Sequence, residues 1–315
     1  MKTKTVPPPR IVVVGSSNTD MVVQTPRIPR PGETLLGGRF TLAAGGKGAN
    51  QAVAAARAGG RVAFVCRLGR DWFGDQALQG FKADGVETRW LVRDAQEPSG
   101  VALIAVAADG ENSIVVAPGA NRRLSRHDVA AAVPAIQKAR VVLAQLEVPL
   151  AAVQATVRQA RKAGAMMILN PAPAQPLPES LLRQIHLLTP NETEAEILTG
   201  VKVDSPRAAA KAALRLRQRG VESVLVTLGA RGVWVASGAE SAHVPGFKVR
   251  AVDTTAAGDV FNGALAVALA EGQALLPAVR FAQAAAALSV TRLGAQPSAP
   301  YREEIERFLR QHADE

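Results

Sequence analysis

The sequence Ile11-Val12-Val13-Val14-Gly15 is a short run of β-branched residues that ends at a glycine. Such a run is typical of a strand that is buried on both faces of a parallel sheet. Ser16-Ser17-Asn18-Thr19-Asp20 follows it directly. Because ligands of open α/β sheets bind beyond the carboxyl ends of the strands, Asn18 and Asp20 are expected to face a polar substrate. Both residue types are also ordinary turn formers, so this motif alone is weak.

The alternation of strand, loop and helix continues along the chain. Strand-like runs are found at 62–66, 141–145, 166–170 and 185–189, and helical patterns at 51–58, 72–83, 151–162 and 276–291. This order predicts an α/β fold with a mainly parallel sheet and helices on both faces. Since no repeat, low-complexity tract or linker interrupts the 315 residues, we expect a single domain over residues 1–315.

Two insertions, at about 18–43 and 97–118, do not fit this alternation. The first is rich in proline and glycine, and the second has two β-rich runs joined around Asp109-Gly110, which is a strong hairpin signal. A small sheet assembled from two insertions is a natural construction for a lid over an active site. The alternative is an ordinary extension of the edge of the main sheet.

The composition excludes several classes of protein. A formal net charge of +10 raises the possibility of nucleic-acid binding, but the basic residues are scattered and only 4% of residues are aromatic, so no nucleic-acid partner is expected. No apolar run approaches the roughly 20 residues that span a bilayer, so we expect no membrane partner. The polar, proline-rich stretch from Met1 to Arg10 does not resemble a signal peptide, which indicates a cytoplasmic protein. The single cysteine, Cys66, is expected to be a small buried hydrophobe.

The stretch from Val252 to Ala264 reads as a site for anions. A helix is expected to begin between Ala256 and Gly258, where its first N–H groups lack intrahelical partners and favour a phosphate or a developing oxyanion. The small residues at 256–258 let a ligand approach the backbone closely. Asp259, at the edge of this cradle, fits a general base that removes a proton from a hydroxyl. A capped core helix is the simpler alternative.

The run Gly45-Gly46-Lys47-Gly48-Ala49-Asn50 is glycine-rich but does not have the spacing of a Walker A motif. Its glycines allow close approach of a ligand, and Lys47 and Asn50 offer donors to a hydroxyl-rich molecule. Glu147 places a carboxylate at the end of another predicted strand.

Two further stretches favour a nucleotide with its metal. Asn191 is expected to cap a helix, with Glu194 at the capping-box position. Capping alone explains both residues, but together they are also suited to holding the water shell of Mg²⁺. Residues 224–234 read as strand, glycine turn and strand, an open backbone that suits the phosphates and ribose of a nucleotide, or a plain hairpin.

Taken in order, five separated segments resemble the ribokinase/phosphofructokinase-B carbohydrate kinase family. They are residues 15–20, 45–50, 191–194, 227–232 and 253–259. The resemblance extends from Arg10 to Leu309 and implies a ribokinase-like three-layer α/β sandwich with a small β-sheet lid. It also implies ATP-dependent phosphorylation of D-ribose at its 5-hydroxyl, which yields D-ribose 5-phosphate and ADP, and a homodimer formed through the lid sheets.

The resemblance further implies a role for individual residues. Asp259 would be the base, and the amides of residues 256–258 would form the anion hole. The sugar would be held by Asn18, Thr19, Asp20, Gly46, Lys47, Gly48, Ala49, Asn50, Glu147 and Asp259. The ATP site would consist of Asn191, Thr227, Leu228, Gly229, Ala230, Arg231, Gly232, Gly258, Asp259 and Gln283. A K⁺ site would be formed by Asp253, Thr255, Ser289, Arg292, Gly294 and Ser298, and Glu194 would act on Mg²⁺ through water. Members of the family commonly have a histidine where Gln283 stands, so stacking on adenine is in doubt here.

Two alternatives remain open at this point. The first is another sugar or nucleoside kinase of the same family, although the predicted lid has few aromatic residues to hold a base. The second is a non-catalytic sugar- or nucleotide-binding regulator that uses its positive charge on DNA. That alternative lacks a helix-turn-helix signal and leaves Asp259 unexplained.

Overall fold

The computed structural model describes residues 10–238 and 240–312, and within them the central sheet has eight strands in the order β14-β13-β12-β11-β10-β9-β1-β4. Their bounds are β1 (Arg10–Val14), β4 (Arg61–Val65), β9 (Val141–Ala144), β10 (Met166–Leu169), β11 (Leu187–Leu188), β12 (Ser223–Thr227), β13 (Val233–Ser237) and β14 (Glu240–Val244). Neighbouring strands from β4 to β12 run parallel, and β13 and β14 are antiparallel additions at one edge. The predicted mainly parallel sheet is confirmed.

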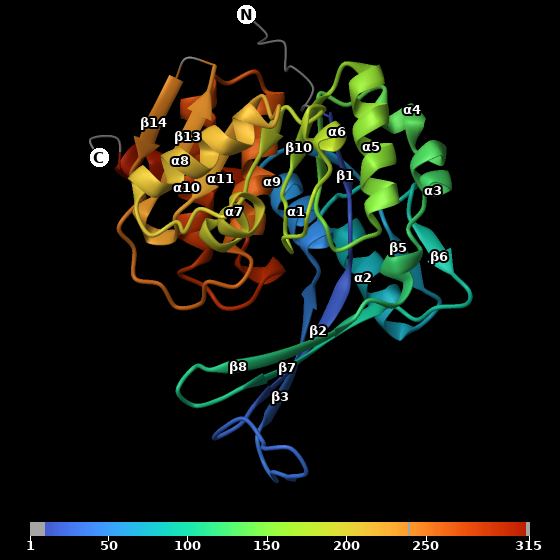
Figure 1. The fold of residues 1–315 in the computed structure, drawn as a ribbon. Helices are drawn as coiled ribbons and strands as arrows, with labels where there is room; N and C mark the ends of the chain where they lie inside the picture. Colours follow the sequence, from blue (N-terminus) through green and yellow to red (C-terminus); the bar gives the residue numbers. More distant parts are fainter. Residues whose placement is uncertain (1–9, 239, 313–315) are drawn as a thin grey trace, which may run out of the picture.

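Helices cover both faces of this sheet (Figure 1) because its strands are apolar on both sides. Ile11 and Val13 of β1 pack into one core, and Val12 and Val14 pack into the other. The first core is closed by α1 (Lys47–Arg57), α2 (Trp72–Ala83), α9 (Ala257–Ala270), α10 (Leu275–Ser289) and α11 (Arg302–Gln311). The second is closed by α3 (Arg126–Ala131), α4 (Val133–Ile136), α5 (Leu150–Ala163), α6 (Glu179–Leu182), α7 (Glu192–Thr199) and α8 (Pro206–Gln218).

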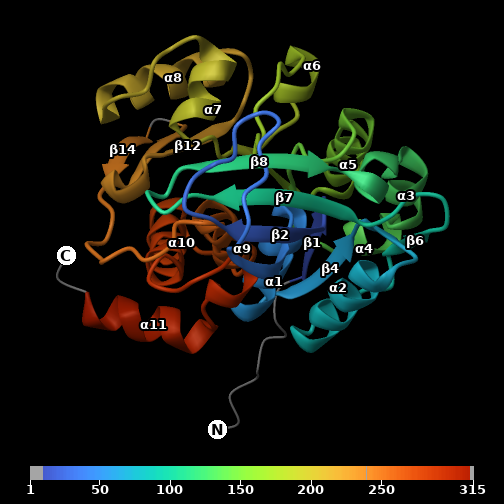
Figure 2. The same cartoon turned by 90° about the horizontal axis from the view of Figure 1, so that it is seen from below.

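A separate small sheet projects from one side of the layered part (Figures 1 and 2). It contains β2 (Asn18–Gln24), β3 (Arg39–Gly45), β7 (Gly100–Val106) and β8 (Asn112–Ala117), in the order β3-β2-β7-β8. The parallel pairing of β2 with β7 joins the two insertions. The predicted hairpin around Asp109-Gly110 connects β7 with the antiparallel β8. The prediction of a small sheet built from two insertions is therefore confirmed, and it is not an extension of the edge of the main sheet.

The remaining elements are short. β5 (Arg67–Gly69) pairs with β6 (Val92–Asp94), and 3₁₀ turns occupy Gly119–Arg123, Gly229–Arg231 and Gln296–Ser298. In the described part of the chain, no helix is long and apolar enough to cross a membrane. Cys66 is fully buried, which raises the pKa of its thiol and agrees with the expected inert role.

Helix α1 begins four residues earlier than the expected 51–58, because its glycines serve close packing rather than a loop. Gly46, immediately before the helix, has φ of 88°, which favours glycine. A Cβ on Gly48 would lie 2.5 Å from the backbone nitrogen of Ser16, so only glycine lets the first turn of α1 rest on the loop after β1. This contact brings Lys47 and Asn50 next to the carboxyl end of β1.

Candidate active site

The first turn of α9 lies at the place where the sequence predicts an anion cradle. The helix begins at Ala257, and Ala256 before it has φ of 59°. A left-handed conformation costs a residue with a side chain about 1–2 kcal/mol, so this turn is held in place by its surroundings. The amides of Gly258 and Asp259 lie in this first turn, where a helix provides no acceptors for them. Both residues line a cavity of about 180 Å³.

Asp259 is 6% exposed and sits at the edge of the cradle. Its two carboxylate oxygens accept hydrogen bonds of 2.9 Å each, one from Nδ2 of Asn50 and one from Nε2 of Gln51. Burial raises the pKa of Asp259, and the charge of Lys47 and these two hydrogen bonds oppose that shift only in part. A buried carboxylate with a raised pKa is suited to general base catalysis.

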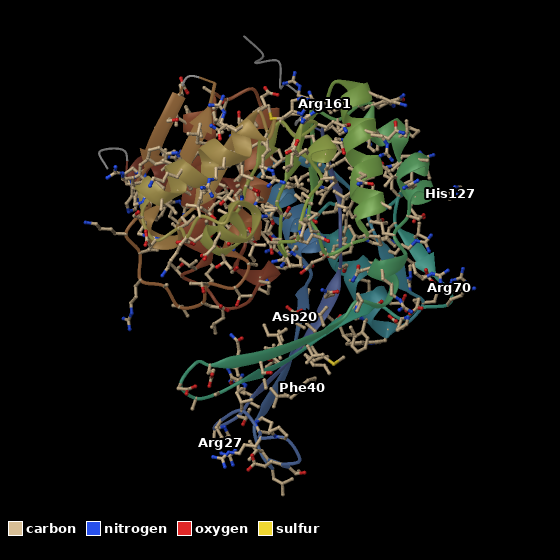
Figure 3. The ribbon with its side chains drawn as sticks, viewed as in Figure 1. Asp20, Arg27, Phe40, Arg70, His127 and Arg161 are labelled. Carbon is tan, nitrogen blue, oxygen red and sulfur yellow. The ribbon has the colours of Figure 1, made fainter. Side chains whose placement is uncertain are left out.

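The loop after β1, the small sheet and the loop after β9 bring further polar groups toward Asp259. Burial, together with the nearby carboxylates of Glu147 and Asp259, raises the pKa of Asp20 to about 6. Figure 3 shows Asp20 at the root of the small sheet, between it and the layered part. Glu147 accepts hydrogen bonds from the Ser16 hydroxyl at 2.5 Å and from the Lys47 amide at 3.0 Å.

The side chains of Asn18 and Asn50 each leave one polar group available to a ligand. Asn18 is held by Asn121, whose Nδ2 donates to Oδ1 of Asn18 at 2.8 Å. The Nδ2 group of Asn18 is therefore the one left to meet a ligand. The buried Oδ1 of Asn50 has no hydrogen-bond partner among the described residues, so it can accept a hydrogen bond from a ligand hydroxyl.

The other members of the predicted sugar set contribute through the backbone or point elsewhere. The amides of Gly48 and Ala49 donate to the hydroxyl and carbonyl of Ser16, at 3.3 and 2.8 Å, so they fix the loop after β1. Thr19 follows Asn18 on β2, so its side chain lies on the opposite face of the small sheet.

Lys47 and Glu194 both line the small cavity, together with Gly258 and Asp259. Burial alone would lower the pKa of Lys47, but the carboxylates of Asp259, Glu147 and Glu194 outweigh it and the pKa is raised. Lys47 therefore stays protonated. Burial raises the pKa of Glu194, which also forms the predicted capping box with Asn191, with bonds of 2.8 and 2.9 Å.

A larger cavity of about 820 Å³ adjoins the small one, and both are lined by Asn191, Thr227, Thr254, Ala257 and Gly258. Of the predicted nucleotide residues, it is lined by Asn191, Thr227, Gly229, Ala230, Gly232, Gly258 and Gln283. Leu228 is instead buried in the core, and Arg231 pairs with Glu192 at 3.0 Å on the surface. Gln283 donates to the Val244 carbonyl at 3.0 Å.

One wall of this cavity and two residues that orient Asp259 and Asn18 were not predicted from the sequence. The larger cavity is also lined by residues 246–251, by Ala286 and Ala287 of α10, and by Val290 directly after that helix. No motif marks 246–251, because a loop that forms the wall of a cavity has no characteristic residue spacing. Gln51 and Asn121 are the other two omissions. Gln51 directly follows the quoted glycine-rich run, which was the only available signal.

The segments of the predicted K⁺ site lie together. The Asp253 carboxylate accepts hydrogen bonds from the amides of Thr255 and Gly294, at 2.9 and 2.8 Å. The carbonyl of Ser289 accepts from the amide of Arg292 at 3.0 Å, and the Ser298 hydroxyl donates to the Ala295 carbonyl at 2.7 Å. The Arg292 side chain points away to Glu304. The described residues contain no cluster of His, Cys, Asp and Glu that could hold a metal by side chains alone.

Comparison with known proteins agrees with this geometry. A curated ribokinase from Haemophilus influenzae is 48% identical over 303 residues, which cover 96% of this chain and 99% of the relative. A deoxyribokinase from Salmonella typhi is 38% identical and covers 95% and 98%. The structure of an Arabidopsis thaliana ribokinase complexed with ribose and ATP superposes with a TM-score of 0.91, at 35% identity, over 96% of this chain and 99% of that one.

The match to a family of known enzymes extends over most of the sequence. Residues 8–302 match the family described as pfkB family carbohydrate kinase. The chain belongs to the pfkB family of carbohydrate kinases.

Proposed function

We propose that the protein transfers the γ-phosphoryl group of ATP to the 5-hydroxyl of D-ribose and releases D-ribose 5-phosphate and ADP. The position of Asp259 supports this proposal most strongly. It lines the small cavity at the start of α9, accepts a hydrogen bond from Asn50, and lies near enough to Asp20 and Glu147 for their charges to interact. The ribokinases that resemble this chain over nearly its full length support ribose as the sugar.

The chemistry follows from the charges around the small cavity. Asp259 accepts the proton of the sugar hydroxyl as the oxygen attacks phosphorus, and the bond between that phosphorus and the ADP oxygen breaks. Charge that develops on the transferring group is stabilised by the amides of the first turn of α9 and by the ammonium group of Lys47. The larger cavity receives the nucleotide. Use of ATP fits the cytoplasmic location expected from the sequence.

Two cations complete the proposal. Mg²⁺ on the nucleotide phosphates would neutralise their charge, and Glu194 is placed to hold its water shell, because it lines the small cavity. A K⁺ ion would fit among the oxygen atoms of Asp253, Thr255, Ser289, Arg292, Gly294 and Ser298. Carboxylate and carbonyl oxygens suit such a hard ion, and at this place it would fix the chain entering the cradle at Ala256.

The small sheet would cover the sugar with one face and meet a second copy of the chain with the other. Asn18 and Asp20 share one face, so the pairing register places Leu42, Leu103 and Val115 on the opposite face. Leu103 is 52% exposed and Val115 is 64% exposed, and Phe40, further out on the same sheet (Figure 3), is 57% exposed. An apolar patch of this kind is typical of a protein interface, which supports a homodimer through these sheets.

The resemblance to a deoxyribokinase makes 2-deoxyribose an alternative substrate to test. We expect ADP release to be fastest with ribose in a panel that also contains fructose, 2-deoxyribose and adenosine. Equal or faster turnover of any other member would replace ribose as the substrate, and no turnover with any of them would remove the proposal of a sugar kinase.

We predict that Asp259→Asn lowers kcat by roughly 10²–10⁴-fold, because the base is lost. Ribose and ATP should still bind, since the other contacts remain, and calorimetric titration of both ligands would check this. A variant that keeps near-normal kcat would exclude Asp259 as the base.

The pKa of Asp20 predicts how activity depends on pH. Below about pH 6 this carboxylate becomes protonated in the free enzyme and loses an acceptor for sugar hydroxyls, so kcat/KM for ribose should fall as the pH drops through 6. In Asp20→Asn, kcat/KM should be lower throughout, and its acid limb should move to lower pH because Asp259 loses a like-charged neighbour. An acid limb that stays at pH 6 in the variant would assign it to another group.

We expect kcat to fall several-fold when K⁺ is replaced by Na⁺ at constant ionic strength, because the smaller ion fits the carbonyl ring poorly. Asp253→Ala should be slow in both salts and insensitive to the exchange. Equal rates of the unaltered protein in both salts would argue against a functional K⁺ site.

The proposed dimer can be tested by introducing a charged residue into the apolar patch of the small sheet. Leu103→Glu should shift the protein from dimer to monomer in sedimentation at micromolar concentration, because it places a carboxylate in the apolar patch. Leu214→Glu is the matched control, since Leu214 is 55% exposed on α8 and should leave the dimer intact. A monomeric unaltered protein would contradict the proposed interface.

A further inference from the structure

A row of buried amide side chains lies behind Asp259. Gln145 follows β9, Asn170 follows β10, and Gln51 projects toward both from α1. Gln51 and Gln145 are fully buried, and Asn170 is 6% exposed. The mechanism proposed above assigns none of these three residues a role, and burying polar groups is costly unless they are hydrogen-bonded in a useful arrangement.

The hydrogen bonds fix the direction of the Gln51 amide. Nε2 of Gln145 donates to Oε1 of Gln51 at 2.6 Å, so the oxygen end of Gln51 must face Gln145. Nε2 of Gln51 then donates to Oδ1 of Asp259, at a nitrogen–oxygen distance of 2.9 Å, and to Oδ1 of Asn170, at 3.0 Å. If the Gln51 amide were flipped, its oxygen would face the Oδ1 atoms of Asp259 and Asn170, and its NH₂ group would face the NH₂ group of Gln145. Gln51 is thus a fixed donor to the base.

With Asn50, this donor fixes the plane of the carboxylate. Asn50 holds Oδ2 of Asp259 and Gln51 holds Oδ1, so the carboxylate cannot rotate without breaking a hydrogen bond. Each oxygen keeps a second lone pair, which is available for the proton of a sugar hydroxyl.

The charged groups that face Asp259 do not replace this contact. They are Lys47 on α1, Glu147 after β9, Asp20 on β2 and Glu194 on α7. Three of these four are carboxylates and favour the protonated form of Asp259, as does its burial. Gln51 is neutral at every pH and favours the ionised form through its hydrogen bond alone.

The same row continues to the phosphate cradle. Nδ2 of Asn170 donates to the Thr189 carbonyl at 3.1 Å, and the Thr189 hydroxyl donates to Oδ1 of Asn262 at 2.7 Å. Nδ2 of Asn262 in turn donates to the Gly258 carbonyl at 2.8 Å. Gln51 therefore connects the base and the first turn of α9 to one continuous network of buried side chains.

We propose that Gln51 is a positioning residue for phosphoryl transfer, which holds the Asp259 carboxylate ionised and in a fixed orientation, while Gln145 sets the direction of the Gln51 amide. This inference rests on the proposed function, since it takes Asp259 as the base. It adds a residue that would contact neither sugar nor nucleotide and would act only through Asp259.

The test is the pH dependence of Gln51→Met, which keeps the length of the side chain and removes the donor. The acid limb of the kcat profile should move up by about one to two pH units, because losing a hydrogen bond to a charged group raises the pKa of that group by about this amount. The plateau of kcat should fall about tenfold as the carboxylate becomes free to rotate. KM for ribose should change by less than about threefold, because Asn50 and the sugar contacts remain.

Two further variants extend the test. Gln51→Glu has nearly the same shape but places a carboxyl group against Asp259, so its acid limb should move up further than that of Gln51→Met. Gln145→Met leaves Gln51 in place but free to flip, and it should give a smaller shift in the same direction. If Gln51→Met does not fold, Gln145→Met decides the question by the same measurement.

Thr156→Val is the control for a merely structural effect. Thr156 is fully buried on α5 and its hydroxyl donates to the Ala152 carbonyl at 2.9 Å. Its loss should lower Tm and leave the pH profile unchanged. An acid limb in both Gln51→Met and Gln145→Met that coincides with that of the unaltered protein would overturn the role of Gln51.

The result also separates this inference from the proposed function. The pKa of Asp259 can be followed directly by NMR of its ¹³C-labelled carboxyl group, with Asp259→Asn to assign the signal, and it should rise in Gln51→Met whether or not ribose is the substrate. Absence of ribose phosphorylation by the unaltered protein would remove the proposed function, whereas an unchanged Asp259 pKa in Gln51→Met would remove only the role of Gln51.

Discussion

The arrangement of the site depends on the burial of one carboxylate, Asp259, at the amino end of α9. Water would stabilise its charge, and burial removes that water, so the protein replaces it with directed donors and a nearby ammonium group. This requirement explains why α1, the loop after β9 and α9 converge. Each of these elements brings polar side chains or backbone amides close to Asp259, and small residues let the elements approach one another closely.

The sequence was sufficient to predict the layers and to single out several residues that line the candidate site, because these features depend on local signals. The β-branched runs predicted buried strands, the dipeptide Asp109-Gly110 predicted the hairpin, and small residues before Asp259 predicted the helix start. Five short segments in order then indicated the family, which the comparisons confirm. Local chemistry is visible in a sequence wherever it demands particular residues at particular spacings.

The parts that were not predicted depend on distant contacts. Gln51 is separated from Asp259 by 208 residues, and nothing in its own surroundings indicates that its amide faces a carboxylate. Asn121 orients Asn18 across 103 residues in the same way. The early start of α1 was also missed, because glycine has a low helix propensity. Only the packing of Gly48 on Ser16 shows why glycine is needed there.

The parallel pairing of β2 with β7 has a mechanical consequence. Asn18 and Asp20 belong to β2, one of the two central strands of the small sheet, and Asn18 pairs in register with Gly100 at the start of β7. If the proposed reaction is correct, the residues that bind the sugar and the strands that shield it from solvent belong to the same small sheet and move as one unit. Tilting the small sheet away from the layered part would weaken the sugar contacts and admit water at the same time. Affinity for the sugar and protection of ATP from hydrolysis would therefore both depend on the angle between the small sheet and the layered part.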